Sequence, residues 1–163
     1  MVRSFFDTSA LVKHYHPETG TAAVDRLVGE PGTELVTSRL TPVETVSVFA
    51  TKVRTGEFDA ASFARLRGRF ATDIARRRYR VVRLLNAHHD RAQDLIRSHG
   101  LARQIRTLDA LELAVALHLH QAAPLDHFAC ADQRLCDLAT REGLSVLNPE
   151  LLTPRVIETD TLR

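Results

Sequence analysis

The chain has 163 residues, of which 44% are hydrophobic and 26% are charged, and its formal net charge is +2. This length suffices for one domain with its own core, and the composition excludes a disordered or fibrous chain. Two cysteines exclude a disulfide framework, a charge interrupts the first apolar residues, and no apolar run is long enough to cross a bilayer. A cytoplasmic protein with no membrane contact is therefore expected.

The first half of the chain alternates short β-prone runs with segments of helical spacing. Strands are predicted at 2–6 and 34–37, and helices at 8–15, 21–28, 42–54 and 59–77. Within 42–54 the apolar residues recur every three or four positions, which is the periodicity of an amphipathic helix. Gly56 is expected to end that helix.

The second half continues the alternation. Strands are predicted at 79–84, 127–131 and 144–147, and helices at 86–98, 108–119 and 133–141. Residues 108–119 are apolar on nearly all sides, which predicts a buried helix. Strands that alternate with helices predict an α/β fold, a three-layer α/β/α arrangement with a short, mainly parallel central sheet. We expect one domain over residues 1–147 and a C-terminal tail over 148–163.

The segment from Lys52 to Arg83 is strongly basic. Arginines dominate it, and only Glu57, Asp59 and Asp73 oppose them. Such a surface suits a polyanionic partner, and the run Arg76, Arg77 and Arg78 is the candidate for contact with it. The alternative is an ordinary solvated helix face.

Four acidic residues stand where predicted helices begin. Asp7 and Asp132 follow strands directly, whereas Glu44 and Asp109 lie in the first turn of their helices. Each has a purely structural explanation. Asp7 and Asp132 are good N-caps, residues 41–44 (Thr-Pro-Val-Glu) fit a capping box, and the helix dipole favours Asp109.

Taken together, the four acids point to a ligand site. Helices that follow parallel strands begin along the carboxyl edge of the sheet, where open α/β folds bind ligands. Carboxylates gathered there would repel one another unless a hard divalent cation such as Mg2+ or Mn2+ neutralised them. Such an ion suits phosphodiester hydrolysis. Convergence depends on the strand order, which spacing alone does not give.

Four segments resemble motifs of the PIN-domain family, in particular VapC-type toxins. Residues 5–13 (Phe-Phe-Asp-Thr-Ser-Ala-Leu-Val-Lys) resemble the family's opening, and 42–44, 108–114 and 128–135 resemble its second, third and fourth acidic positions, in family order. The resemblance implies a metal-dependent ribonuclease. The metal ligands would chiefly be Asp7 and Asp109, with Glu44 and Asp132 completing the pocket. Ser9 matches a hydroxyl that orders the first acid.

The same resemblance implies the toxin of a type II toxin–antitoxin pair. Such a toxin has an RNA substrate, a cognate antitoxin that blocks the site, and a homodimeric state. One position departs from the family pattern, because Cys130 stands where the family usually has Ser or Thr. A thiol is a poor hydrogen-bond donor, so Asp132 would be less well supported.

Two questions stay open at this level. Glu112 lies one helical turn beyond Asp109, so it either extends the acidic pocket or pairs with a neighbouring arginine. The whole molecule could also be a non-catalytic RNA- or protein-binding module on the same fold. In that case the four acids are helix caps and the basic segment is the working surface.

Overall fold

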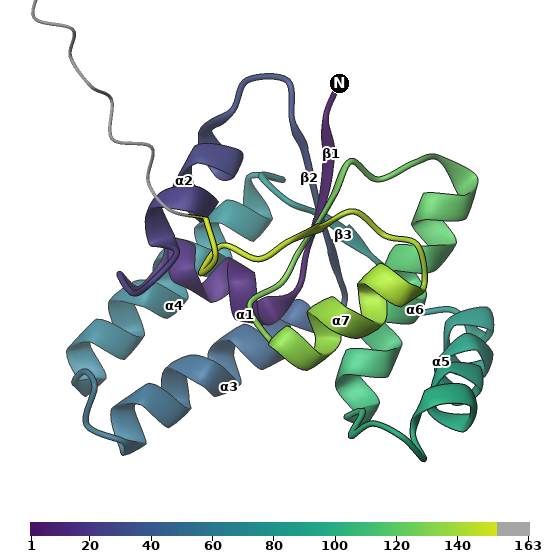
Figure 1. Ribbon diagram of the computed structural model, residues 1–163. Helices are drawn as coiled ribbons and strands as arrows, with labels where there is room; N and C mark the ends of the chain where they lie inside the picture. Colours follow the sequence, from purple (N-terminus) through teal and green to yellow (C-terminus); the bar gives the residue numbers. More distant parts are fainter. Residues whose placement is uncertain (153–163) are drawn as a thin grey trace, which may run out of the picture.

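The computed structural model describes residues 1–152, and its centre is a parallel sheet (Figure 1). Over these residues the strand order is β3-β2-β1-β4-β5, and every neighbouring pair is parallel. The strands are β1 (Arg3–Phe6), β2 (Glu34–Ser38), β3 (Arg80–Val82), β4 (His127–Ala129) and β5 (Val146–Leu147). The predicted parallel sheet is confirmed.

Helices cover both faces of this sheet, which confirms the predicted three-layer fold. The helices are α1 (Thr8–Leu11) with the 3-10 turn η1 (Val12–His14), α2 (Thr21–Gly29), α3 (Thr41–Arg54), α4 (Ala60–Ala75), α5 (Asn86–His99), α6 (Thr107–Ala122) and α7 (Gln133–Arg141). Successive strand residues point to opposite faces. Phe5 accordingly packs with α5, α6 and α7, whereas Phe6 packs with α1 to α4.

Predicted and observed element boundaries differ at several places, and α6 extends to Ala122 where the prediction ended at 119. The helix expected over 8–15 ends at Leu11 and continues as a 3-10 turn, ahead of Pro17, whose preceding residue disfavours helical backbone. The strand expected over 79–84 is paired only over Arg80–Val82. None of these differences moves an acidic candidate to another element.

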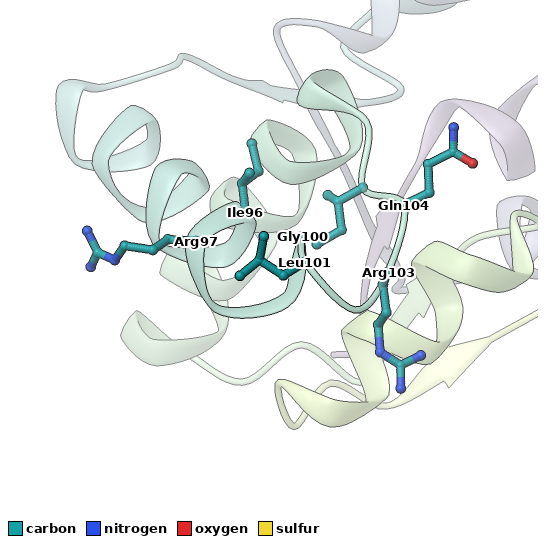
Figure 2. A pocket seen from close by; sticks show the side chains of 7 residues that line it. Ile96, Arg97, Gly100, Leu101, Arg103 and Gln104 are labelled. Carbon is teal, nitrogen blue, oxygen red and sulfur yellow. The ribbon is translucent and has the colours of Figure 1, made fainter.

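The connection between α5 and α6 borders a hollow of about 530 Å³. Figure 2 shows Ile96 and Arg97 at the end of α5, and Leu101 and Arg103 in the connection. A smaller hollow of about 180 Å³ includes part of the same connection together with Arg134 of α7. Both hollows are lined by Arg103, Gln104 and Ile105 of this connection.

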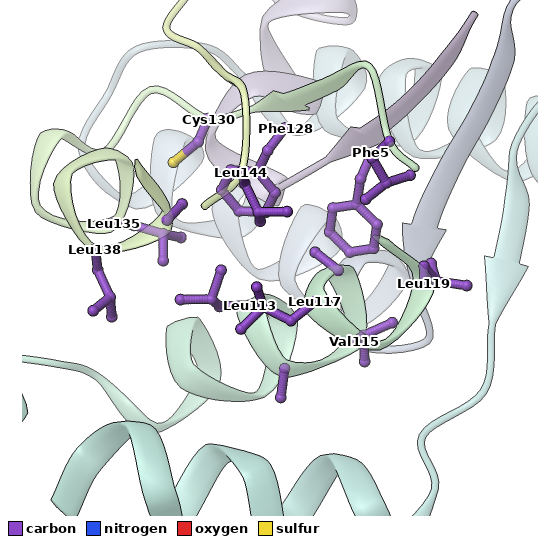
Figure 3. Close-up of a cluster of buried hydrophobic side chains, with 14 of the residues drawn as sticks. Phe5, Leu113, Val115, Leu117, Leu119, Phe128, Cys130, Leu135, Leu138 and Leu144 are labelled. Carbon is purple, nitrogen blue, oxygen red and sulfur yellow. The ribbon is translucent and has the colours of Figure 1, made fainter. Parts of the chain in front are cut away.

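The core on the α6 face combines the strand residues Phe5 and Phe128 with leucines and alanines of α5, α6 and α7 (Figure 3). The rings of Phe5 and Phe128 stack with their centroids 5.7 Å apart. Ala110 and Ala114 of α6 are fully buried, and such small side chains let the helix approach the sheet closely. This confirms the predicted burial of α6 and fixes where its first turn, with Asp109, meets the sheet edge.

The first residues of the predicted tail contact the domain. Lys13 Nζ donates to Glu150 Oε1 at 2.7 Å, and Pro149 is buried beside Gly20. Gly20 has φ +91°, and a Cβ there would lie 2.9 Å from the Pro149 carbonyl carbon, so this contact requires glycine. Residues 153–163, the rest of the predicted tail, lie outside the described residues. Within 1–152, no helix has the length and apolar character needed to cross a membrane.

Candidate active site

The strand order brings the carboxyl ends of β1 and β4 together at the centre of the sheet. The chain passes from β1 to β2 on one side and later returns to β4 on the other, which makes a topological switch point. Asp7 follows β1, and Asp132 follows β4 and begins α7. Glu44 and Asp109 lie in the first turns of α3 and α6. Helix α6 follows α5 and not a strand, but the charges of Asp7, Asp132 and Glu44 act on the Asp109 carboxyl, so all four predicted residues lie close together.

Asp7 is buried and is held through one oxygen. Its Oδ2 accepts the backbone N–H of Ser9 at 2.9 Å and a short hydrogen bond from the Ser9 hydroxyl. The Ser9 Oγ in turn accepts the backbone N–H groups of Ala131 at 2.9 Å and Asp132 at 3.4 Å. Ser9 thus fixes Asp7 and joins it to the loop that carries Asp132.

Glu44 does not act as a capping residue. The N-cap of α3 is Leu40, which makes no side-chain cap, so the predicted capping box is wrong. The Glu44 Oε2 instead accepts the hydroxyl of Thr8 at 2.9 Å, and the Thr41 hydroxyl donates to Glu112 at 2.6 Å. Thr41 and Glu44 therefore bond to α6 and α1 and do not form the capping box with each other.

Asp132 combines a cap with a place in the site. Its Oδ1 accepts the backbone N–H groups of Arg134 at 2.9 Å and Leu135 at 3.2 Å, so the N-cap is confirmed. The thiol of Cys130 lies 3.8 Å from Asp7 Oδ2 and 3.5 Å from the main-chain oxygen of Asp132. Contact with Cys136, then burial, raises the pKa of Cys130, which keeps it a neutral thiol.

Negative charge is crowded at this edge. Burial, and then the charges of Asp7 and Asp132, raise the pKa of Asp109 to about 6. Burial and the charge of Asp7 also raise the pKa of Glu44. These couplings show that carboxylates from four separate segments lie within electrostatic reach of one another.

Glu112 joins this cluster from the second turn of α6. It is 1% exposed, and its Oε1 accepts the hydroxyls of Ser38 at 2.8 Å and Thr41 at 2.6 Å. Its Oε2 accepts the Thr8 backbone N–H at 3.4 Å. Burial above all, followed by the charge of Asp7, raises the pKa of Glu112 well above its usual range. No ion pair with an arginine involves Glu112 in the described part of the chain.

The donor set fits a hard divalent cation, because every candidate ligand is a carboxylate oxygen. In the present side-chain arrangement, no three His, Cys, Asp or Glu residues within 1–152 surround a common point closely enough to hold an ion. The residues still fit Mg2+ or Mn2+ by their chemistry, since such an ion can be held by one or two carboxylates together with water.

The basic residues divide into two groups. Arg76, Arg77 and Arg78 are exposed and lie between α4 and the amino end of β3, whereas Asp7 and Asp132 follow the carboxyl ends of β1 and β4. Arg106 and Arg134 are nearer the acids, as the N-cap of α6 and in the first turn of α7. Sequence analysis missed these two because they stand singly, although each is within three residues of an acidic motif position.

A model of the family described as PIN domain matches residues 4–140. The chain belongs to the PIN domain family. The match includes all four acidic positions, and the resemblance drawn from the motifs is confirmed. No curated protein sequence matches the chain.

Solved structures support the same fold for this PIN domain. VapC20 of Mycobacterium tuberculosis, described as a sarcin-ricin loop cleaving toxin, aligns with TM-score 0.61 and 16% identity over 90% of this chain and 99% of its own. FitAcB of Neisseria gonorrhoeae aligns with TM-score 0.64 and 17% identity over 91% and 99%. A toxin–antitoxin complex of Klebsiella pneumoniae aligns with TM-score 0.55 and 17% identity over 90% and 97%.

Proposed function

We propose that this PIN domain is a Mg2+- or Mn2+-dependent endoribonuclease and the toxin of a type II toxin–antitoxin pair. The observation that carries the proposal is the gathering of Asp7, Glu44, Asp109 and Asp132. The charge of Asp7 raises the pKa of Glu44, and the charges of Asp7, Asp132 and Glu44 raise that of Asp109. Such crowding is costly without a cation, and phosphodiester hydrolysis is chemistry that a carboxylate-bound cation supports.

Asp7 and Asp109 would hold the ion. When bound, the ion supplies positive charge that offsets the carboxylates and polarises the phosphodiester. The chain's own donors fix the ligands beforehand: Ser9 holds one oxygen of Asp7, and Thr8 holds one oxygen of Glu44. The backbone N–H groups of Arg134 and Leu135 hold Oδ1 of Asp132, so Oδ2 of Asp132 can face a water or the substrate. Ligands restrained in this way lose little freedom when an ion binds.

Arginines would bind the RNA backbone. Arg106 and Arg134 are placed to contact phosphates beside the scissile bond, since each lies next to an acidic residue. Arg76, Arg77 and Arg78 would contact the strand farther away. Phosphate contacts of this kind give affinity that falls with salt and fix the register of the strand.

A cognate antitoxin, a homodimeric state and a cytoplasmic location complete the proposal. The antitoxin is supported by the Klebsiella neighbour, which is a toxin–antitoxin complex. A short reading frame for a small DNA-binding protein beside the gene would support the pairing. Growth arrest on induced expression, relieved by coexpression of that neighbour, would test it.

The direct test is cleavage of structured RNA by purified protein. Wild type should cut with Mg2+ or Mn2+ and stop cutting in chelator. Asp7→Asn, which keeps the shape of the side chain, should reduce the rate by at least about 100-fold. Equal cleavage by Asp7→Asn would assign the activity to a contaminant. RNA binding without cleavage, and with no Mn2+ binding, would instead identify a non-catalytic module.

A further inference from the structure

The structure points to a function for a fifth carboxyl that the four motifs do not include. We propose that Glu112 is a positioning residue that fastens the helices carrying Asp109, Asp7 and Glu44 to one another, and so presents these three carboxylates together to a divalent cation. The inference rests on the proposed metal-dependent function.

Glu112 connects three acid-bearing segments through hydrogen bonds. It stands three residues after Asp109 in α6, so it moves with that residue. Its Oε1 receives hydroxyls from Ser38 at 2.8 Å and Thr41 at 2.6 Å, which flank the beginning of α3 and hence Glu44. One carboxyl oxygen therefore fixes α3 against α6.

The other oxygen of Glu112 reaches α1. Its Oε2 accepts the backbone N–H of Thr8, the residue directly after Asp7, at 3.4 Å. The hydroxyl of the same Thr8 donates to Glu44 at 2.9 Å. Thr8 thus forms a bridge between Glu112 and Glu44, and the network closes on itself.

The hydrogen bonds of Glu112 are closed to solvent, because Glu112 and its partners Ser38, Thr41 and Thr8 are all buried. Glu112 and Thr41 are 1% and 0% exposed. A buried carboxyl needs partners, and here side-chain hydroxyls and a backbone amide supply them. Partners that orient metal ligands in this way typically change metal affinity or activity about 10–100-fold when removed.

The test compares Glu112→Ala with Glu112→Gln. The amide keeps an oxygen for the two hydroxyls and loses only the long 3.4 Å contact from the Thr8 backbone N–H, so Glu112→Gln should stay within about threefold of wild type. Glu112→Ala should lower kcat about 10–100-fold with KM for RNA changed less than twofold. The Mn2+ concentration that half-saturates the protein, measured by titration without RNA, should rise by a similar factor.

Glu34→Ala is the matched control. Glu34 is also a glutamate that joins separate strands, through Arg3 at 2.7 Å and Arg80 at 2.9 Å, but it lies at the amino end of β2. The Glu34→Ala variant should lower the stability of the fold without changing its affinity for Mn2+. If Glu112→Ala and Glu34→Ala reduced activity equally, and only in proportion to the unfolded fraction, the positioning role would be refuted.

A second variant covers the case in which Glu112→Ala does not fold. Thr41→Val removes one donor to Glu112 and should raise the half-saturating Mn2+ concentration about threefold or more. Mn2+ affinity equal to wild type in Thr41→Val and in a folded Glu112 variant would overturn the inference. If wild type binds Mn2+ but cuts no RNA, the proposed function fails, and Mn2+ affinity still decides the role of Glu112.

Discussion

Replacing Asp109 by asparagine should stabilise the metal-free protein. Burial, followed by the charges of Asp7 and Asp132, raises the pKa of Asp109 from 3.8 to about 6. The folded state therefore disfavours the ionised carboxylate, and asparagine removes the charge while it keeps the shape. Each pKa unit corresponds to about 1.4 kcal/mol. Because Asp109 is partly exposed, screening reduces the expected gain to about 1–2 kcal/mol.

The opposing effect is smaller. A carboxylate in the first turn of a helix is favoured by the helix dipole by about 0.3–1 kcal/mol, and asparagine loses that term. Since repulsion and burial exceed it, the net change should still be stabilising. In urea titrations, the midpoint should rise at an unchanged slope, and the melting temperature should rise by roughly 2–8 °C.

The pH dependence of stability tests separately whether Asp109→Asn is stabilising. Below about pH 4 the carboxyl is protonated in both the folded and the unfolded state, so the variant gains nothing. Between about pH 4 and pH 6 the unfolded chain ionises first, and the stability of the wild type falls as pH rises. The advantage of Asp109→Asn should therefore grow across this window and remain level above it.

Unfolding in chelator at pH 4.5 and 7.5 measures both effects. Asp90→Asn, an exposed aspartate of α5, is the control and should change stability by less than about 0.5 kcal/mol. With saturating Mn2+ the order should reverse, because wild type gains binding free energy that the variant lacks. If Asp109→Asn were instead less stable than wild type by 1 kcal/mol or more in chelator at pH 7.5, Asp109 would be a helix-stabilising residue, and repulsion would not set its pKa.

Two further outcomes are expected. Cys130→Ser should leave the rate of RNA cleavage within about threefold of wild type, because a thiol 3.8 Å from Asp7 is a weak donor; a tenfold loss in the same assay would show that the thiol matters. Lys13→Met should lower the free energy of unfolding in urea by about 1–2 kcal/mol, because the buried Nζ pairs with Glu18 at 3.1 Å and Glu150 at 2.7 Å; unchanged stability would mean that these pairs contribute nothing.

Most of the fold follows from local patterns. The alternation of short apolar runs with helical spacing predicts every strand and helix, and the bounds of α7 (Gln133–Arg141) agree with the prediction at both ends. Edges of short strands depend on pairing with neighbours, which is why β3 is shorter than its β-prone run. Strand order is a property of the whole chain, and spacing along the sequence does not contain it.

The site was less accessible to sequence reasoning than the fold. Four acidic positions could be selected because each lies at the start or in the first turn of a helix. For Glu112 the sequence leaves two alternatives, an extension of the acidic pocket or an ion pair with an arginine, because only the fold brings Ser38 and Thr41 to it. A charged residue inside an apolar helix such as α6 is itself a signal, because full burial of an unpartnered carboxyl is too costly to be accidental.

The failed capping box shows why the acids at this edge are more than helix starts. Thr41 and Glu44 have the spacing for a local cap, and forming it would need no other part of the chain. The structure instead directs the Thr41 hydroxyl to Glu112 and the Glu44 carboxylate to Thr8, in a crowded region where burial and Asp7 raise the Glu44 pKa. The missing cap and the repulsion between Glu44 and Asp7 both cost stability, and the stability of α3 alone does not explain them. Binding of a cationic ligand by these carboxylates would offset both costs.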